Sequence, residues 1–176
     1  RRCKYDPRNG YYGQFMWGPQ FDQGGNPILG TNEFAGQQLD LTLDLPDMEN
    51  NKENAGARNI KYKVKIGAKG LANDFVIFRL AETYFNLAEA PLRQSGTPDT
   101  EALAGINALR SRAGVPAYTA QTLTLDELYD EKGREMCYET ARRTDMIRFG
   151  RFTLPMWDKN YTDNPRVTIF PIPYTA

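Results

Sequence analysis

The chain has 176 residues, with 22 lysines and arginines balanced by 22 aspartates and glutamates, and it contains no histidine. The balanced charge gives no basic footprint for nucleic acid, and the lack of histidine removes the commonest general base and metal ligand. No apolar run approaches the ~20 residues that a membrane helix needs. Hydrophobic residues make up 40% of the sequence, which is enough for the core of one domain.

The first 36 residues are rich in aromatic rings, glycine and proline, which is typical of a long irregular loop. Aromatic faces cover the apolar C–H faces of a pyranose, while amide and carboxylate groups bind its hydroxyls. We therefore expect a sugar site here, and the candidate ligands are Tyr11, Tyr12, Trp17, Gln20 and Asp22. The alternative is that these rings pack the loop onto the rest of the chain, because large rings usually go to burial.

Two short strands are predicted after this loop. Leucines alternate with polar residues from Leu39 to Leu45, and apolar residues alternate with lysines over Asn59–Ile66, as in strands with one exposed face. The polar segment Asp47–Asn54 lies between them. It lacks the residue order of an EF-hand, so we expect a solvated loop there and no metal site.

A long helix is predicted from Phe75 to about Ser95, with Asn73 and Asp74 as its cap and Gly96 as its stop. Apolar residues recur along it at spacings of three and four, which predicts a buried stripe of Ile77, Leu80, Ala81, Tyr84, Leu87, Ala88 and Pro91/Leu92. Pro91 removes one backbone hydrogen bond and clashes with the preceding turn, so we expect a bend or an early end near it.

A second helix is predicted to begin at Thr97-Pro98, with the proline as its first helical residue, and to end at Gly114. The two helices and their turn span about the 34 residues of a tetratricopeptide-type repeat. This pairing predicts a mainly helical fold.

A charged stretch follows from Leu123 to Gly150. Thr124 and Glu127 have the spacing of a capping box at the start of a helix. Asp145 is expected to open a second short helix that Gly150 closes. Cys137 occupies an apolar helical position and is expected to be a core thiol, while its pairing with Cys3 depends on the fold.

Several blocks of the sequence resemble, in the same order, the signature of the SusD/RagB-like family. Glu131 to Gly150 reads E-K-x-R-E-M-x-x-E-x-x-R-R-x-D-M-I-R-F-G, against the family's E-R-x-x-E-L-x-x-E-x-x-R-x-x-D-L-x-R-W. The other matching blocks are G-A-R-x-x-K-Y from Gly56, F-R-L-A-E-T-Y-F-N-L-A-E-A from Phe78, I-N-A-L-R-S-R-A-G-V-P from Ile106 and I-F-P-I-P from Ile169. The chain departs from the family pattern at Pro91, Lys132 and Ala141.

The resemblance implies a mainly α fold, with tetratricopeptide-like helix pairs, long irregular loops and a few short strands. It implies a lipid-anchored protein on the outer face of the outer membrane of Gram-negative bacteria. Such proteins take part in polysaccharide utilisation: they bind oligosaccharides and deliver them to a TonB-dependent, SusC-like transporter. They are not enzymes and need no cofactor. The signature residues Glu135, Glu139, Arg142 and Asp145 are then expected to form a structural hydrogen-bonded network, because buried charges persist only when paired.

We expect the sequence to be a fragment of a longer protein. Residues 1–57 are predicted to form a loop-rich aromatic segment that faces the ligand, and residues 58–176 a helical portion of the same domain. Two other functions are kept open, namely a helical-repeat module that binds proteins and a glycoside hydrolase, which would need two carboxylates about 5–9.5 Å apart.

Overall fold

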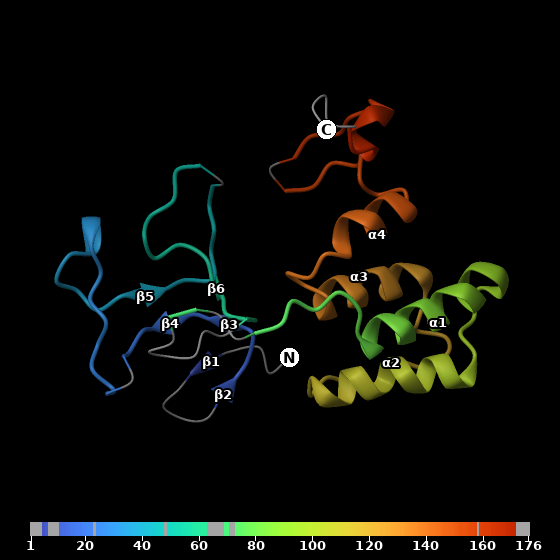
Figure 1. Ribbon diagram of the computed structural model, residues 1–176, viewed down its shortest axis with the longest axis horizontal. Helices are drawn as coiled ribbons and strands as arrows, with labels where there is room; N and C mark the ends of the chain where they lie inside the picture. Colours follow the sequence, from blue (N-terminus) through green and yellow to red (C-terminus); the bar gives the residue numbers. More distant parts are fainter. Residues whose placement is uncertain are drawn as a thin grey trace. The chain divides into compact units, whose positions relative to one another are not determined.

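The computed structural model describes residues 5–6, 11–22, 24–47, 49–62, 69–70, 73–157 and 159–171. Within these residues the protein has four α-helices and six strands of two residues each, so the predicted mainly helical fold is confirmed. The chain divides into two compact units (Figure 1). The first unit holds Arg1–Phe75 with Ala113–Val115, and the second holds Val76–Arg112 with Pro116–Ala176.

Short antiparallel strand pairs organise the described part of the first unit. They pair β1 (Tyr5–Asp6) with β2 (Tyr11–Tyr12), β3 (Phe15–Met16) with β6 (Arg58–Asn59), and β4 (Gly18–Pro19) with β5 (Asp40–Leu41). A single turn of 3-10 helix, η1, spans Asn32–Phe34. The first pair lies within the aromatic loop, and the other two pair that loop with strands later in the chain.

The predicted strand from Leu39 to Leu45 is only partly correct. Leu41 is buried, but Leu43 and Leu45 are exposed, because β5 ends at Leu41 and the chain then hydrogen-bonds to residues around Asn54. The predicted strand over Asn59–Ile66 begins as β6 at Arg58–Asn59. Because β6 ends at Asn59, the prediction is wrong for residues 60–62, which are described and form no strand. Residues 63–66 lie outside the described residues, so that part stays a prediction.

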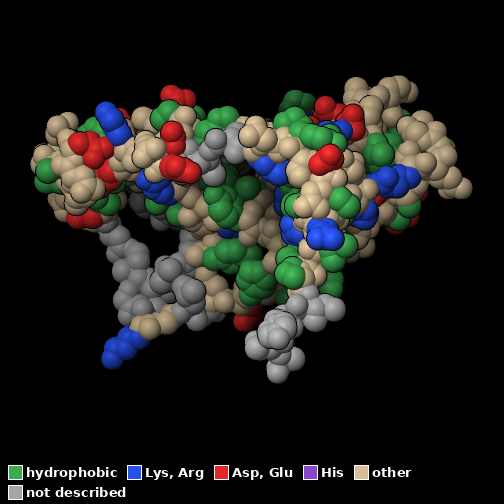
Figure 2. Space-filling model, turned by 90° about the horizontal axis from the view of Figure 1, so that it is seen from above, with side chains coloured by type: hydrophobic (Ala, Val, Ile, Leu, Met, Phe, Trp, Pro, Cys, Tyr) green, Lys and Arg blue, Asp and Glu red, His purple; other side chains and the backbone are tan. Residues whose placement is uncertain are grey.

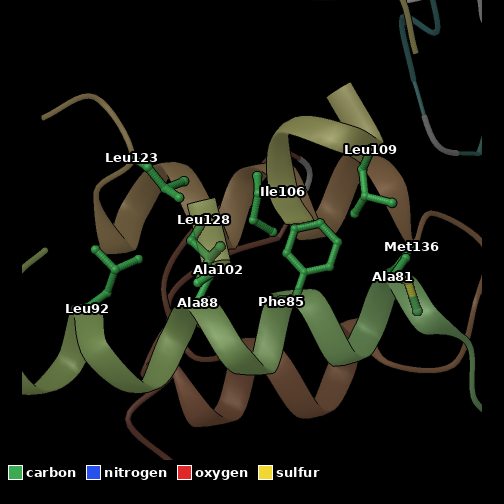
Figure 3. Close-up of a cluster of buried hydrophobic side chains, with 10 residues drawn as sticks. All are labelled: Ala81, Phe85, Ala88, Leu92, Ala102, Ile106, Leu109, Leu123, Leu128 and Met136. Atoms are coloured by element: carbon green, nitrogen blue, oxygen red, sulfur yellow. The ribbon is translucent and has the colours of Figure 1, made fainter. Parts of the chain in front are cut away.

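The second unit packs its helices around one apolar cluster. The helices are α1 (Leu80–Ser95), α2 (Thr100–Arg112), α3 (Leu125–Glu135) and α4 (Arg142–Arg148), followed by a 3-10 turn, η2 (Pro165–Thr168). Figure 3 shows the cluster between α1, α2 and α3, with Phe85 and Ile106 fully buried near its centre. The predicted pair of helices, α1 and α2, is present.

Helix α1 begins later than predicted, at Leu80, with Arg79 as its N-cap residue in an extended conformation. Asn73 and Asp74 therefore do not cap it. Of the bend or early end predicted near Pro91, the early end is wrong, because the helix continues to Ser95, and the bend stays a prediction. Ala88 and Leu92 flank the proline and are both buried in the cluster, which holds this part of the helix in place. Gly96, at φ 78°, ends the helix as predicted.

The N-terminal caps of α2 and α3 are set by side chains. Asp99 accepts a hydrogen bond from the Ala102 amide at 2.8 Å, so α2 starts after Asp99 and not at Pro98 as predicted. Thr124 caps α3 as predicted, because its hydroxyl accepts from the Glu127 amide at 3.2 Å. Helix α4 begins at Arg142, which places Asp145 within its first turn and not at its start.

Candidate functional site

The aromatic segment of the first unit carries the predicted sugar ligands. Tyr11 and Tyr12 form β2, and only their backbone is described. Trp17 lies between β3 and β4 and is half-buried. The strand pairs on both sides of Trp17 hold its backbone in a defined position.

Gln20 follows β4 and stabilises the loop around it. Its side-chain amide donates to the Gly18 carbonyl at 2.7 Å, and its backbone amide donates to Leu39 at 2.8 Å. The backbone carbonyl of Gln20 accepts a hydrogen bond from the backbone amide of Ile28 at 3.0 Å. One of the two N–H donors of the Gln20 side chain is thus used within the loop.

Asp22 is exposed and forms a tight turn with Asn26. One carboxylate oxygen accepts from the Asn26 backbone amide at 2.8 Å, and the other accepts from the Asn26 side chain at 3.1 Å. These hydrogen bonds, the side-chain one foremost, lower the pKa of Asp22 below its ordinary value of 3.8. Trp17, Gln20 and Asp22 thus lie on one ordered segment, and their role as sugar ligands stays a prediction.

The signature stretch of the second unit distributes its charges over separate ion-pair clusters. In the first, Arg79 at the start of α1 donates to Glu139 at 2.7 Å and to the Glu135 carboxylate at 2.9 Å. Arg79 also donates to the Glu135 backbone carbonyl at 2.9 Å, and Arg112 forms a further ion pair with the Glu135 carboxylate. Burial alone lowers the pKa of Arg79, but the hydrogen bonds with the two carboxylates outweigh it and raise that pKa.

A second cluster surrounds Asp145. Its carboxylate accepts from Lys132 at 2.9 Å, with both side chains buried, and from Arg148 at 2.9 Å. Arg148 reaches on to Glu89 at 2.6 Å, and Glu89 also pairs with Arg93 at 2.7 Å. The cluster therefore links α1, α3 and α4 through alternating charges, as buried ionised groups require.

Arg142 belongs to neither of these clusters. Its guanidinium donates to the Tyr129 carbonyl at 3.0 Å and lies 3.9 Å from the centre of the Tyr129 ring. The guanidinium also fills the space beside Gly133, where a Cβ atom would approach it to 2.6 Å. The four predicted network residues are thus in three different places: Glu135 with Glu139, Asp145, and Arg142. Their structural role stays a prediction.

Sequence reasoning missed the cations that hold these carboxylates, chiefly Arg79, Lys132 and Arg148. All three lie inside the family blocks, Arg79 in F-R-L-A-E, Lys132 in E-K-x-R-E and Arg148 in D-M-I-R-F. Glu89 of the A-E-A block pairs with Arg148. The signal was the charge inside otherwise apolar helical segments. Figure 2 shows acidic and basic side chains interspersed on the face in view, in line with this pairing.

Other candidate sites are less developed. Asp47 accepts from the backbone amides of Asn50 and Glu49, and these bonds lower its pKa, with that from Asn50 the larger cause. Among the described residues no group of three acidic or sulfur side chains is placed to hold a metal ion. Cys137 is half-buried, while Cys3 lies outside the described residues, so their pairing stays open. In the same part of the chain, no helix has the length and apolar character to cross a membrane.

Comparison with known proteins points to one family. The SusD family model matches residues 30–170. Over 87 residues the chain is 46% identical to the "Starch-binding protein SusD" of Bacteroides thetaiotaomicron, and the alignment covers 48% of this chain and 15% of that protein. The chain is also similar to the crystal structure of a SusD superfamily protein from Parabacteroides distasonis. That comparison gives 16% identity and a TM-score of 0.47, over 83% of this chain and 41% of the other. The chain thus matches less than half the length of either relative.

Proposed function

This chain belongs to the SusD family, and we propose that it forms part of a surface protein that binds oligosaccharides and delivers them to a TonB-dependent, SusC-like transporter. The observation that carries the proposal is the match of the family model over residues 30–170. The curated relative at 46% identity is described as starch-binding, which makes starch the first glycan to test. In this proposal the protein lies at the outer membrane, lipid-anchored and facing outside.

In this proposal the aromatic segment contacts the sugar. Trp17 provides a ring for a pyranose face, with Tyr11 and Tyr12 before it in the same segment. The free carbonyl oxygen of the Gln20 side chain and the ionised Asp22 carboxylate accept hydrogen bonds from hydroxyls. Since strand pairs and turns already order this backbone, binding costs little conformational entropy.

The signature residues are proposed to stabilise the packing of the helices and not to act as catalysts. A glycoside hydrolase needs two carboxylates that flank the scissile bond of its substrate. In the second unit the side chains of Glu131, Glu139 and Asp145 are buried, and each forms an ion pair with an arginine or a lysine. These ion pairs and the family support a non-enzymatic role.

One observation favours a second candidate, a module that binds other proteins. The segment before α1 exposes Phe75, Ile77 and Phe78 to solvent, and Phe78 is 85% exposed. Exposed apolar patches of this kind mark surfaces that pack against another protein element. A repeat-like helix pair also needs neighbours to bury its faces. Both functions are compatible within one larger protein.

The test uses the full-length protein on a glycan array and then in calorimetry. Trp17→Ala is expected to abolish glycan binding at the aromatic segment while leaving the melting temperature nearly unchanged, and Trp17→Phe to retain part of the affinity. A large fall in melting temperature for Trp17→Ala would instead make Trp17 a packing residue. Failure of the wild-type protein to bind any glycan would contradict the proposal. Detectable release of reducing sugar from a bound glycan would instead favour the glycoside hydrolase.

A further inference from the structure

Residues 153–162 form a closed loop in the second unit, between α4 and η2. The Thr162 amide donates to the Thr153 carbonyl at 3.0 Å, which closes the base of the loop. Met156 and Lys159 exchange backbone hydrogen bonds of 2.9 and 3.0 Å near its tip. The Lys159 ammonium donates to the Phe152 carbonyl and lies 4.8 Å from the centre of the Phe152 ring. These contacts fix the backbone of the loop at both ends.

The loop presents two large aromatic side chains to solvent. Trp157 follows Met156 at the tip and is 59% exposed, and Tyr161 near the base is 60% exposed. Rings of this size are normally buried, because each removes a large apolar area from water when it packs. Within the described part of the chain neither ring packs against another ring or cation. Two exposed rings on an ordered loop therefore need a ligand or partner to account for them.

The polar residues beside these rings indicate which kind of ligand fits. Asn160 and Asp163 are exposed, and no other described residue forms a hydrogen bond with either side chain. An amide and a carboxylate between and beside aromatic rings match a molecule with apolar faces and hydroxyl edges. The patch before α1 differs, since Phe75, Ile77 and Phe78 follow one another almost without polar side chains, as suits burial against protein.

The charge of the loop narrows the ligand class. Residues 153–163 carry two carboxylates, Asp158 and Asp163, against one ammonium, Lys159, so their net charge is −1. Like charges repel, so a glycan rich in carboxylates or sulfates is disfavoured. The preference is for a neutral oligosaccharide.

We propose that loop 153–162 and the adjacent Asp163 form a second carbohydrate-binding site, in which Trp157 and Tyr161 stack on pyranose faces and Asn160 and Asp163 bind hydroxyls of a neutral oligosaccharide. This inference rests on the proposed glycan-binding function, but it concerns residues outside the aromatic segment of the first unit. The fixed backbone lowers the entropy that binding has to overcome.

The experiment measures binding of maltoheptaose, xylohexaose, mannohexaose and polygalacturonate to the full-length protein by calorimetry. With the neutral oligosaccharide that binds most tightly, Trp157→Ala is expected to raise the dissociation constant about tenfold or more, a loss of at least about 1.4 kcal/mol in binding free energy. Tyr161→Ala is expected to raise the dissociation constant less, and Trp157→Phe to retain part of the affinity. Met156→Ala is the matched control, because Met156 lies in the same loop and is 46% exposed but has no ring.

The outcomes separate the two proposals. If no glycan binds to the wild-type protein, the proposed function fails and this inference fails with it. If glycan binds and Trp17→Ala abolishes binding while Trp157→Ala changes nothing, only the second site is refuted. Equal losses for Met156→Ala and Trp157→Ala would also refute it, since a general apolar contact would then explain the loop. Tighter binding of polygalacturonate than of every neutral oligosaccharide would overturn the ligand class.

Discussion

Glu139 offers the sharpest test of the charged signature, because its carboxylate is buried and its partner is known. The Glu139 side chain is 4% exposed and accepts from Arg79 at 2.7 Å. Glu139→Gln keeps the size of the side chain and one hydrogen-bond acceptor but removes the negative charge. Arg79 then keeps Glu135 as its ion-pair partner, through the carboxylate, with a further hydrogen bond to the Glu135 backbone carbonyl.

The expected cost follows from this partial loss. A hydrogen bond to a charged group contributes about 1.5–3 kcal/mol, so the free energy of unfolding should fall by about 2 kcal/mol. For a protein of this size, 1 kcal/mol corresponds to roughly 2–4 °C in melting temperature, which gives a fall of about 4–8 °C. Complete removal of the Arg79 side chain should cost more, because both carboxylates would then lie buried without their main cation.

The assay is urea unfolding of the wild-type protein, of Glu139→Gln and of a control, Asp126→Asn. Asp126 also pairs with an arginine, Arg151, but its side chain is 77% exposed, so its loss should cost less than ~1 kcal/mol. Affinity for the best array glycan should be the same in all three proteins. The structural role is refuted if Glu139→Gln is as stable as the control, or if it loses glycan affinity while keeping its stability.

Two further predictions concern packing and titration. In Gly105→Ala a Cβ atom would approach Tyr84 to 2.5 Å, so we expect a loss of about 1–3 kcal/mol in thermal unfolding, largely relieved in a Tyr84→Ala background. Equal costs in both backgrounds would contradict this contact. Asn26→Ala should raise the pKa of Asp22 toward 3.8 in an NMR titration, because Asn26 is the main cause of the lowered value. The turn stabilises the fold above the unfolded pKa of Asp22, and this contribution is lost as pH falls through the folded one; an unshifted titration would refute it.

The first unit shows how far sequence patterns reach when pairing is non-local. The composition of the aromatic segment predicted an irregular loop, and the structure has strand pairs of two residues with turns between them. The alternation of leucines after Leu39 predicted a longer strand than β5 provides, because an exposed strand also needs a partner of matching length. The local sequence did not predict that Gly18 would pair with Leu41 in the β4–β5 ladder.

Helix α1 shows a related difference in phase. The helical period was evident, and Ala81, Ala88 and Leu92 are buried as the stripe required. The stripe also included Leu80 and Leu87, which are exposed, and it left out Phe85, which is fully buried. Because α1 packs against both α2 and α3, their positions decided which side of the apolar face became the core.

Features that depend on neighbouring residues were predictable from the sequence: the cap at Thr124, the stop at Gly96 and the family blocks. Those features arise within a turn or two of chain, so local spacing is enough to predict them. The partners in the buried ion pairs depend on how the helices pack, since Arg79 lies 60 residues from Glu139 and Glu89 lies 59 residues from Arg148. A buried charge pairs with whichever opposite charge helix packing brings within reach, and the spacing of residues along the chain does not contain that information.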